Sequence, residues 1–407
     1  MNKVIIVREN YDWINIGNGS TELTEEEFLN LKNYLEFYLK TKKILEFSLK
    51  KFRFYNYVGF IQIENILIEI YPKTSPLENL EEDKRNFLNI LYKSKELNLN
   101  LLSNFQSQVS SLGFYELLIR KYIILLREKL QGGLFKDFEK IEKNSNTLKG
   151  KILLEKHLKL NLHNSSKIYC EQISLEYNNI INIIIKKTLE ILFKNIKNYK
   201  LKKDILCLLN FFQKVDTKIF NLNLLSKPIF NRKTLPWKEI FTLSKAIIEK
   251  NDYSYENGNK KAFSMIFYMP KIYEKYIFYL LRNSINIKNM DIIYQDNSQK
   301  LLINQETGKE HITLKPDFII LNKNIPYLIV DAKWKNSYSQ NDIYQIYTYL
   351  SKYENIKKGI LIFPKFSEED KDIFWTVNIN NISKNITIKY INIQDFEHEI
   401  LSLKVLF

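Results

Sequence analysis

The sequence predicts a multidomain α+β protein, and three observations support this fold class. Residues 1–78 alternate apolar and polar side chains with the two-residue period of strands, which predicts a small β-rich N-terminal domain. Residues 79–255 carry helical periodicity and form a mainly helical assembly region. Residues 262–407 are expected to run helix, strands, helix and strand, which is typical of an α/β domain with a mixed sheet. A chain of 407 residues that is 45% hydrophobic can bury several cores.

The N-terminal domain shows its alternation most clearly in residues 53–63 and 66–70. One helix is expected near Thr24 to Lys40, because Thr24 is followed by three glutamates that suit a first turn. The aromatic side chains from Phe52 to Phe60 allow two interpretations. They either fill the core of the β domain or lie exposed as anchors for a protein partner.

The middle region contains two clear helical patterns, Phe114–Leu130 and Ile180–Phe193. Gln131–Gly133 predicts a helix stop and Asn144–Gly150 a loop. Lys250–Lys261, rich in Asn, Asp, Gly and Tyr, is the best candidate for a linker to the C-terminal domain.

The C-terminal domain carries the residues that predict chemistry. Residues 325–333 form an apolar run that ends in charge, so they predict a buried strand whose carboxyl end opens into a cleft. Asp331 and Lys333 are two residues apart and share one face of that strand. Asp317 lies fourteen residues before Asp331, after Lys315 and Pro316. On its own, an Asp-x-Lys pair at a strand end is a common surface feature.

Two acids and one lysine in this order suit metal-dependent hydrolysis of a phosphodiester. The reaction requires charge neutralisation on the phosphate, an activated water and help for the leaving oxygen, and a bound divalent cation supplies all three. Mg²⁺ is typically held by one or two carboxylates, so Asp317 and Asp331 suffice as anchors, with Mn²⁺ as an alternative ion. Lys333 would orient or polarise the attacking water and offset the growing negative charge.

A helix is predicted over residues 339–352, with Ser339 or Asn341 as the N-cap. At about 100° per residue, one apolar stripe forms the core face; it consists of Ile343, Ile346, Tyr347 and Leu350. Gln345 and Tyr349 lie on the opposite side as i, i+4 neighbours. Tyr349 either packs in the core or has a polar role near the phosphate, and its position beside Gln345 favours the polar role.

Together, Pro316-Asp317, Asp331-Ala332-Lys333 and Gln345-x-x-x-Tyr349 resemble the PD-(D/E)xK (restriction-endonuclease-like) nuclease superfamily in its RecB-like form. More narrowly, the chain resembles the McrC family, the nuclease subunits of McrBC modification-dependent restriction systems. The similarity extends over nearly the whole chain, through residues 58–73, Gly133-Leu134, residues 148–151, Asn178–Asn182 and Met269–Glu274. Tyr71, Ile272 and Tyr273 depart from the residues usual in the family's motifs.

The resemblance implies a role for each motif residue and a partner. Glu274 would be the helix-borne acid that completes the metal site, although a glutamate after Pro270 in the first turns of a helix that runs to about Arg282 also suits the helix dipole. Gln345 and Tyr349 would belong to the catalytic site. A McrB-like AAA+ GTPase hexamer would recognise modified double-stranded DNA and translocate, while this chain docks on it, stimulates GTP hydrolysis and cuts.

Two other functions stay open: an autonomous RecB-like repair nuclease, and a non-catalytic adaptor that bridges a motor to DNA. The net charge of +15 favours a polyanionic partner, although a lysine- and asparagine-rich composition also arises from genomic base bias.

Several other classes of protein are disfavoured by the sequence. The two cysteines and four dispersed histidines predict neither a disulfide framework nor a zinc or histidine-based site, so a reducing cytoplasm is expected. No GxxxxGK[ST] loop is present, so the chain is not expected to bind nucleotide, and no stretch reaches the length of a membrane span.

Overall fold

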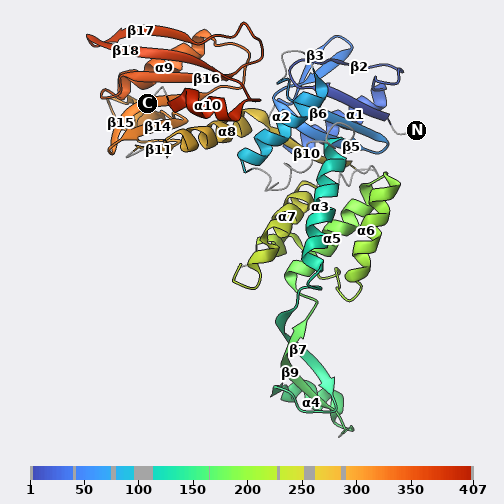
Figure 1. Ribbon diagram of the computed structural model, residues 1–407. Helices are drawn as coiled ribbons and strands as arrows, with labels where there is room; N and C mark the ends of the chain where they lie inside the picture. The colour runs from blue at the N-terminus through green and yellow to red at the C-terminus, as the bar shows by residue number, and fades with distance from the viewer. Residues whose placement is uncertain are drawn as a thin grey trace. The chain divides into compact units, whose positions relative to one another are not determined.

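The computed structural model describes residues 3–39, 43–74, 79–95, 113–164, 166–226, 230–251, 262–285 and 290–404. These residues divide into two compact units (Figure 1). The first combines Met1–Tyr115 with Asn257–Phe407, and the second is Glu116–Glu256. The mixed α/β, multi-sheet architecture expected from the sequence is confirmed, whereas the three-part division at 78 and 255–262 stays a prediction. Most of the expected linker, Lys250–Lys261, lies outside the described residues.

The first unit begins with two small sheets. A four-stranded sheet has the order β1 (Lys3–Arg8), β6 (Ile66–Tyr71), β5 (Tyr57–Ile63) and β10 (Ala262–Tyr268), with β1 parallel to β6 and the other pairs antiparallel. A three-stranded sheet has the order β2 (Ile14–Asn15), β4 (Lys51–Phe54) and β3 (Leu45–Ser48). Helices α1 (Glu25–Leu39) and α2 (Leu80–Lys93) accompany them. The Thr24 hydroxyl accepts a hydrogen bond from the Glu27 amide, as the expected helix start requires.

Two features of this part bear on what the sequence led us to expect. β10 pairs with β5, so residues 262–268 complete the N-terminal sheet rather than the sheet of the C-terminal region. An apolar run such as this one carries no information about which sheet it joins. Of the two interpretations of the aromatics from Phe52 to Phe60, the structure favours core filling, because Phe52, Phe54, Tyr57 and Phe60 are buried, although Tyr55 is 38% exposed.

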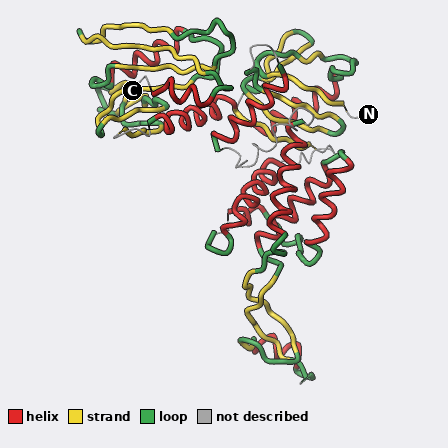
Figure 2. The backbone as a smooth tube through the Cα atoms, viewed as in Figure 1, coloured by secondary structure: helices red, strands yellow, loops and turns green. Residues whose placement is uncertain are grey.

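The second unit contains a helical part and a β ribbon (Figures 1 and 2). Its helices are α3 (Phe114–Leu130), α4 (Leu154–Asn161), α5 (Ile180–Asn195), α6 (Tyr199–Phe211) and α7 (Lys238–Asn251), with 3-10 turns at Leu222–Ser226 and Leu235–Trp237. The first residue of α3, Phe114, and its neighbour Tyr115 fall in the first unit. The two predicted helices agree with α3 and α5, and the predicted stop follows α3, where Gly133 has a φ of 85°.

The ribbon was not expected in this mainly helical region. β7 (Asp137–Ser145) pairs antiparallel with β9 (Ile168–Glu176) over nine residues, and β8 (Lys151–Ile152) adds a short third strand. The predicted loop at Asn144 therefore starts two residues later, because Asn144 and Ser145 still pair with β9. Charged residues interrupt β7, so its strand period is weak in the sequence.

The C-terminal part of the first unit is built on a six-stranded mixed sheet. Its order is β11 (Met290–Tyr294), β14 (Phe318–Asn322), β15 (Ile325–Ala332), β16 (Lys358–Pro364), β18 (Ile382–Ile391) and β17 (Ile373–Ile379). The central pairs β15/β16 and β16/β18 are parallel and the outer pairs antiparallel. β12 (Lys300–Ile303) and β13 (Glu310–Thr313) form a separate hairpin, and the helices are α8 (Met269–Ser284), α9 (Gln340–Lys352) and α10 (Phe396–Lys404).

Helix α9 is held against this sheet at two points. A Cβ atom on Gly359 of β16 would lie 2.7 Å from Cγ1 of Ile346, so glycine permits the close approach of the helix. At the other end, the buried Nζ of Lys384 on β18 donates hydrogen bonds to the carbonyl oxygens of Leu350 at 2.6 Å and Glu354 at 3.0 Å. This lysine bonds the carbonyl of Leu350, in the last turn of α9, where carbonyls lack intrahelical partners, and that of Glu354 just beyond the helix.

Candidate active site at the carboxyl end of β15

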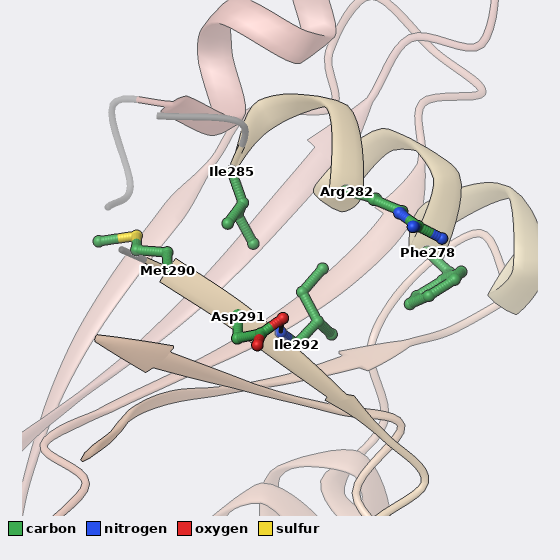
Figure 3. Close-up of a pocket in the computed structure, with 6 residues that line it drawn as sticks. All are labelled: Phe278, Arg282, Ile285, Met290, Asp291 and Ile292. Atoms are coloured by element: carbon green, nitrogen blue, oxygen red, sulfur yellow. Dashed lines mark hydrogen bonds between the residues drawn. The ribbon is translucent and has the colours of Figure 1, made fainter. Parts of the chain in front are cut away.

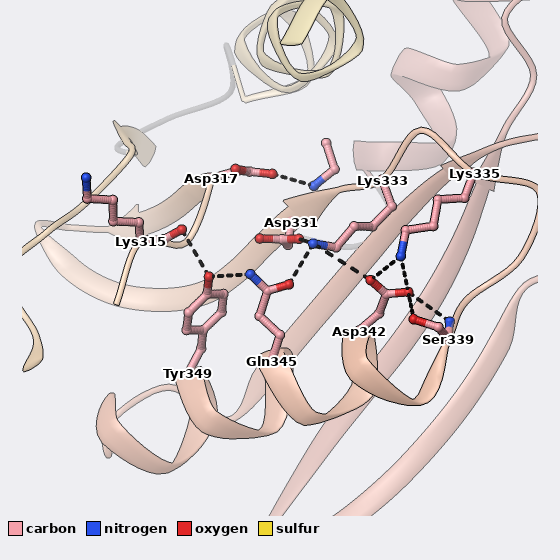
Figure 4. A network of polar contacts seen from close by, with 10 residues as sticks. Lys315, Asp317, Asp331, Lys333, Lys335, Ser339, Asp342, Gln345 and Tyr349 are labelled. Carbon is pink, nitrogen blue, oxygen red and sulfur yellow. Dashed lines mark hydrogen bonds and ion pairs between the residues drawn. The ribbon is translucent and has the colours of Figure 1, made fainter. Parts of the chain in front are cut away.

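Asp331 and Lys333 leave the carboxyl end of β15 on one face and meet directly (Figure 4). Nζ of Lys333 lies 2.5 Å from Oδ2 of Asp331, and Asp331 is only 2% exposed. The amide of Lys333 donates to the carbonyl of Ile362 on β16 at 2.8 Å, so its backbone stays in register beyond the end of the strand. The extended backbone places the side chains of Asp331 and Lys333 on one face of the strand, as expected from the sequence.

Asp317 lies at the same edge of the sheet, just before the amino end of the adjacent strand β14. It precedes β14, whose first residue Phe318 pairs with Val330 of β15. Oδ2 of Asp317 accepts a hydrogen bond of 2.8 Å from the amide of Ala332. The two acids therefore stand on neighbouring antiparallel strands, with one backbone amide fixing Asp317 against β15.

A chain of three hydrogen bonds runs from the lysine along α9 (Figure 4). Nζ of Lys333 donates to Oε1 of Gln345 at 2.7 Å, and Nε2 of Gln345 donates to the hydroxyl of Tyr349 at 2.8 Å. That hydroxyl donates to the carbonyl of Lys315 at 3.0 Å. Gln345 and Tyr349 thereby tie Lys333 to the segment that carries Asp317.

The face of α9 was predicted only in part. Tyr349 is 4% exposed and belongs to the buried side, whereas Tyr347, which we placed in the apolar stripe, is 40% exposed. Tyr349 combines both interpretations, because its ring is buried while its hydroxyl makes the polar contacts. A helical wheel alone does not show which of two tyrosines near the boundary of the buried face is buried.

Asp342 is a member of the cluster that we did not predict. It is buried in the first turn of α9, where it forms a capping box with Ser339, and both of its oxygens accept hydrogen bonds from Nζ of Lys335 at 2.7 and 2.8 Å. Oδ1 also lies 3.9 Å from Nζ of Lys333. The Ser339-x-x-Asp342 spacing signals the cap in the sequence, but not its position beside Lys333.

The electrostatics of the cluster follow from burial and from the proximity of like charges. Burial, with the negative charges of Asp331 and Glu274, raises the pKa of Asp317 well above its ordinary value. Burial also raises the pKa of Asp331, although Lys333 opposes that shift. Burial alone would lower the pKa of Lys333, but the surrounding carboxylates, Asp331 foremost, raise it, so Lys333 stays cationic.

Glu274 lies on α8 near this cluster and has other partners. Its Oε1 accepts a hydrogen bond of 2.8 Å from Nε2 of Gln295, and it also bonds to Tyr294, whose pKa is raised by burial and by this glutamate. Its charge raises the pKa of both Asp317 and Asp331. Its role as a third metal ligand stays a prediction.

The cluster matches the donors that Mg²⁺ prefers. Across the described ranges, no group of three or more His, Cys, Asp or Glu lies close enough to hold a metal ion. Asp317 and Asp331 provide the two carboxylates with which Mg²⁺ is commonly held, the remaining positions being filled by water and phosphate. A divalent cation between two buried acids would favour the ionised form of both, which their mutual repulsion now opposes.

A hollow of about 430 Å³ lies between α8 and β11 (Figure 3). It is lined by Phe278, Arg282, Ile285, Met290, Asp291 and Ile292. None of these residues belongs to the acid cluster, so the hollow is separate from the candidate active site. Among the helices described, none is long and apolar enough to cross a membrane.

Fold and site together define a multidomain α/β protein with two buried acids and one lysine at the ends of paired strands in a mixed sheet. The sequence matches the family described as the McrBC 5-methylcytosine restriction system component over residues 52–364. This chain therefore belongs to that family, and the resemblance to McrC is confirmed. No curated protein sequence matches the chain.

Two solved structures from Thermococcus gammatolerans share the fold. A chain of the refined half-complex from a tetradecameric assembly of McrB AAA+ hexamers with bound McrC superposes with a TM-score of 0.76 at 17% identity, covering 99% of this chain and 100% of that chain. A chain of the cryo-EM structure of the McrBC complex gives a TM-score of 0.57 at 17% identity, covering 69% of this chain and 88% of that chain.

Proposed function

We propose that this chain is the Mg²⁺-dependent DNA endonuclease subunit of a McrBC-like restriction complex in the cytoplasm. The observation that carries the proposal is the cluster of Asp317, Asp331 and Lys333, held in place by Gln345 and Tyr349. Its residue order is that of the PD-(D/E)xK nucleases, and the mixed sheet supports this fold for the C-terminal region. The family description, a 5-methylcytosine restriction system component, supports modified duplex DNA as the substrate.

Each residue of the cluster would have a separate role in the reaction. Asp317 and Asp331 would hold Mg²⁺, or Mn²⁺ in its place, which supplies charge neutralisation on the phosphate and an activated water. Lys333 stays cationic and would stabilise negative charge that develops on the phosphate oxygens. Gln345 orients the lysine, and Tyr349 fixes the backbone that precedes Asp317. Glu274 would complete the acidic shell from α8.

We further propose that a McrB-like AAA+ GTPase hexamer is the partner, and that this chain docks on it and stimulates its turnover. The similar Thermococcus gammatolerans half-complex comes from an assembly of McrB AAA+ hexamers with bound McrC. This chain has no GxxxxGK[ST] loop with which to hydrolyse nucleotide itself.

The best candidate for the docking surface is the β7/β9 ribbon. Phe138 is 61% exposed, and Leu175 lies directly opposite it on β9 and is also exposed. Ile173 lies two residues from Leu175 and therefore on the same face of the strand, and it is exposed as well. Apolar side chains gathered on a solvent-facing ribbon are typical of a protein contact site.

Reconstitution with the partner GTPase tests this function. The chain with Mg²⁺ is expected to cut plasmid DNA poorly, because the sequence shows no module that reads bases and basic charge gives only nonspecific affinity. The chain and its GTPase together, with GTP and Mg²⁺, should cut methylated plasmid and spare the unmethylated one. Cleavage is measured by gel electrophoresis, with the GTPase alone and EDTA as controls.

Two outcomes would overturn the proposal. Efficient site-specific cutting by the chain without partner or nucleotide would favour an autonomous repair nuclease. A complex that hydrolyses GTP and binds methylated DNA yet never cuts it would favour a non-catalytic adaptor.

A further inference from the structure

A buried acid from the N-terminal sheet reaches the residue next to the proposed catalytic lysine. Glu9 directly follows β1 and is 3% exposed. Its Oε1 accepts a hydrogen bond of 2.5 Å from Nε1 of Trp334, which lies 325 residues further along the chain. Among the residues described, Oε2 of Glu9 is buried without a hydrogen-bond partner.

Trp334 connects this acid to both sides of the candidate active site. It follows Lys333, whose amide is bonded to β16, and its indole is buried. The ring centroid of Tyr273 on α8 lies 5.1 Å from that of the indole. The ring centroid of Phe366 lies 5.5 Å from that of the indole, in an edge-to-face arrangement. Because Tyr273 precedes Glu274, the indole contacts the sequence neighbour of Glu274 and is itself the neighbour of Lys333.

A buried glutamate such as Glu9 would be unfavourable if it only filled space in the core. Burying a carboxyl group costs free energy unless it is hydrogen-bonded, and an aliphatic side chain would fill the same space without that cost. What Glu9 offers that an aliphatic residue does not is a directional bond to the indole, beside a hydrogen bond to the backbone of Asn56. Burial raises the pKa of Glu9 to about 8, opposed by its hydrogen bonds with Trp334 and with the backbone of Asn56, so the group is largely neutral at pH 7.

We propose that Glu9 and Trp334 form a positioning pair through which the N-terminal sheet sets the geometry of the cleavage site. The bond from Glu9 fixes the orientation of the indole, and the indole fixes the backbone of Lys333 against Tyr273 of α8. Neither residue touches the phosphate. The inference rests on the proposed nuclease function, and it adds a route by which the N-terminal sheet influences catalysis.

The test uses the full chain in its complex with the GTPase and compares single-turnover cleavage rates on methylated DNA. Trp334→Phe keeps an aromatic side chain, though a smaller one, and removes the N–H donor, and Glu9→Leu removes the acceptor. Each is expected to slow cleavage about tenfold or more, since small displacements of a catalytic group have effects of this size. Glu9→Gln keeps an acceptor in a neutral side chain and should stay within about twofold of the native rate.

The double variant Glu9→Leu/Trp334→Phe separates positioning from general damage. If the two residues act only through their mutual bond, the double variant should be no slower than the slower single variant. DNA affinity and GTP turnover should match those of the native complex. Trp375→Phe, a change at a half-exposed tryptophan on β17, serves as the matched control and should leave the cleavage rate unchanged.

Each outcome decides the matter. If Trp334→Phe and Glu9→Leu lower the melting temperature but cleave at the native rate per folded molecule, the pair is structural packing and the inference is wrong. Multiplying effects in the double variant would also overturn it. If Glu9→Leu does not fold, Trp334→Phe and Glu9→Gln still decide. If the native complex itself does not cleave, the proposed function and this inference fall together.

Discussion

Replacing Asp331 with Asn is expected to abolish DNA cleavage by the reconstituted complex while GTP turnover continues at the native rate. The substitution removes a carboxylate that would hold the metal ion, and with it several kcal/mol of transition-state stabilisation. Because each 1.4 kcal/mol corresponds to a factor of ten, the rate should fall by roughly a thousandfold or more. Lys333→Met should have a similar effect on cleavage, measured under single-turnover conditions.

Asparagine keeps the shape of Asp331, which is 2% exposed, but removes the negative charge that lies 2.5 Å from Nζ of Lys333. Truncating one member of a buried ion pair leaves an uncompensated charge that destabilises a protein by about 3–5 kcal/mol. The melting temperature therefore needs to be measured beside the cleavage rate. Glu368→Gln, a change at an exposed acid, is the control for lost charge. Native cleavage by Asp331→Asn with Mg²⁺ would show that the site is wrongly assigned.

Replacing Phe138 and Leu175 with Ser is expected to weaken the apparent affinity of the chain for the partner GTPase by roughly thirtyfold or more, and so to lower GTPase stimulation at subsaturating chain concentration. These cross-strand neighbours are exposed on the ribbon, and a central apolar anchor in an interface contributes about 2 kcal/mol or more. Since their side chains face solvent in the isolated chain, the fold should be little affected. GTP turnover is titrated against chain concentration, so that lost affinity is distinguished from lost maximal stimulation.

Phe374→Ser is the matched control, because Phe374 is an exposed aromatic side chain on edge strand β17 of the first unit. It should leave GTPase stimulation unchanged. Native stimulation by the ribbon variant, together with a loss for Phe374→Ser, would place the docking surface on the first unit instead.

Local patterns in the sequence were enough to predict the strand and helix that carry the candidate site. Residues 325–332 and 340–352 form β15 and α9, because an apolar run ending in charge and a capped amphipathic helix are local signals. The shared face of Asp331 and Lys333 follows from strand geometry alone. Which of Tyr347 and Tyr349 is buried depends on the curvature and packing of the sheet beneath the helix, and the sequence period does not contain that information.

Contacts between distant residues could not be predicted from one sequence. The pairing of β10 with β5 joins residues about 200 positions apart, and the bond between Glu9 and Trp334 joins residues 325 positions apart. Neither leaves a local pattern. The β7/β9 ribbon was missed for a different reason. Charged residues interrupt the apolar positions of β7, and both strands bury little, so they lack the apolar content that marks a core strand.

Binding of Mn²⁺, followed by electron paramagnetic resonance, tests most directly whether Asp317 and Asp331 form a metal site. Mn²⁺ replaces Mg²⁺ as a spectroscopic probe and prefers the same oxygen ligands. The full chain should bind Mn²⁺ at this cluster, and Mg²⁺ should displace it. Asp317→Asn and Asp331→Asn should each remove that binding, whereas Glu368→Gln should keep it. Mn²⁺ binding that survives both Asp317→Asn and Asp331→Asn would contradict a metal-dependent nuclease site at the carboxyl end of β15.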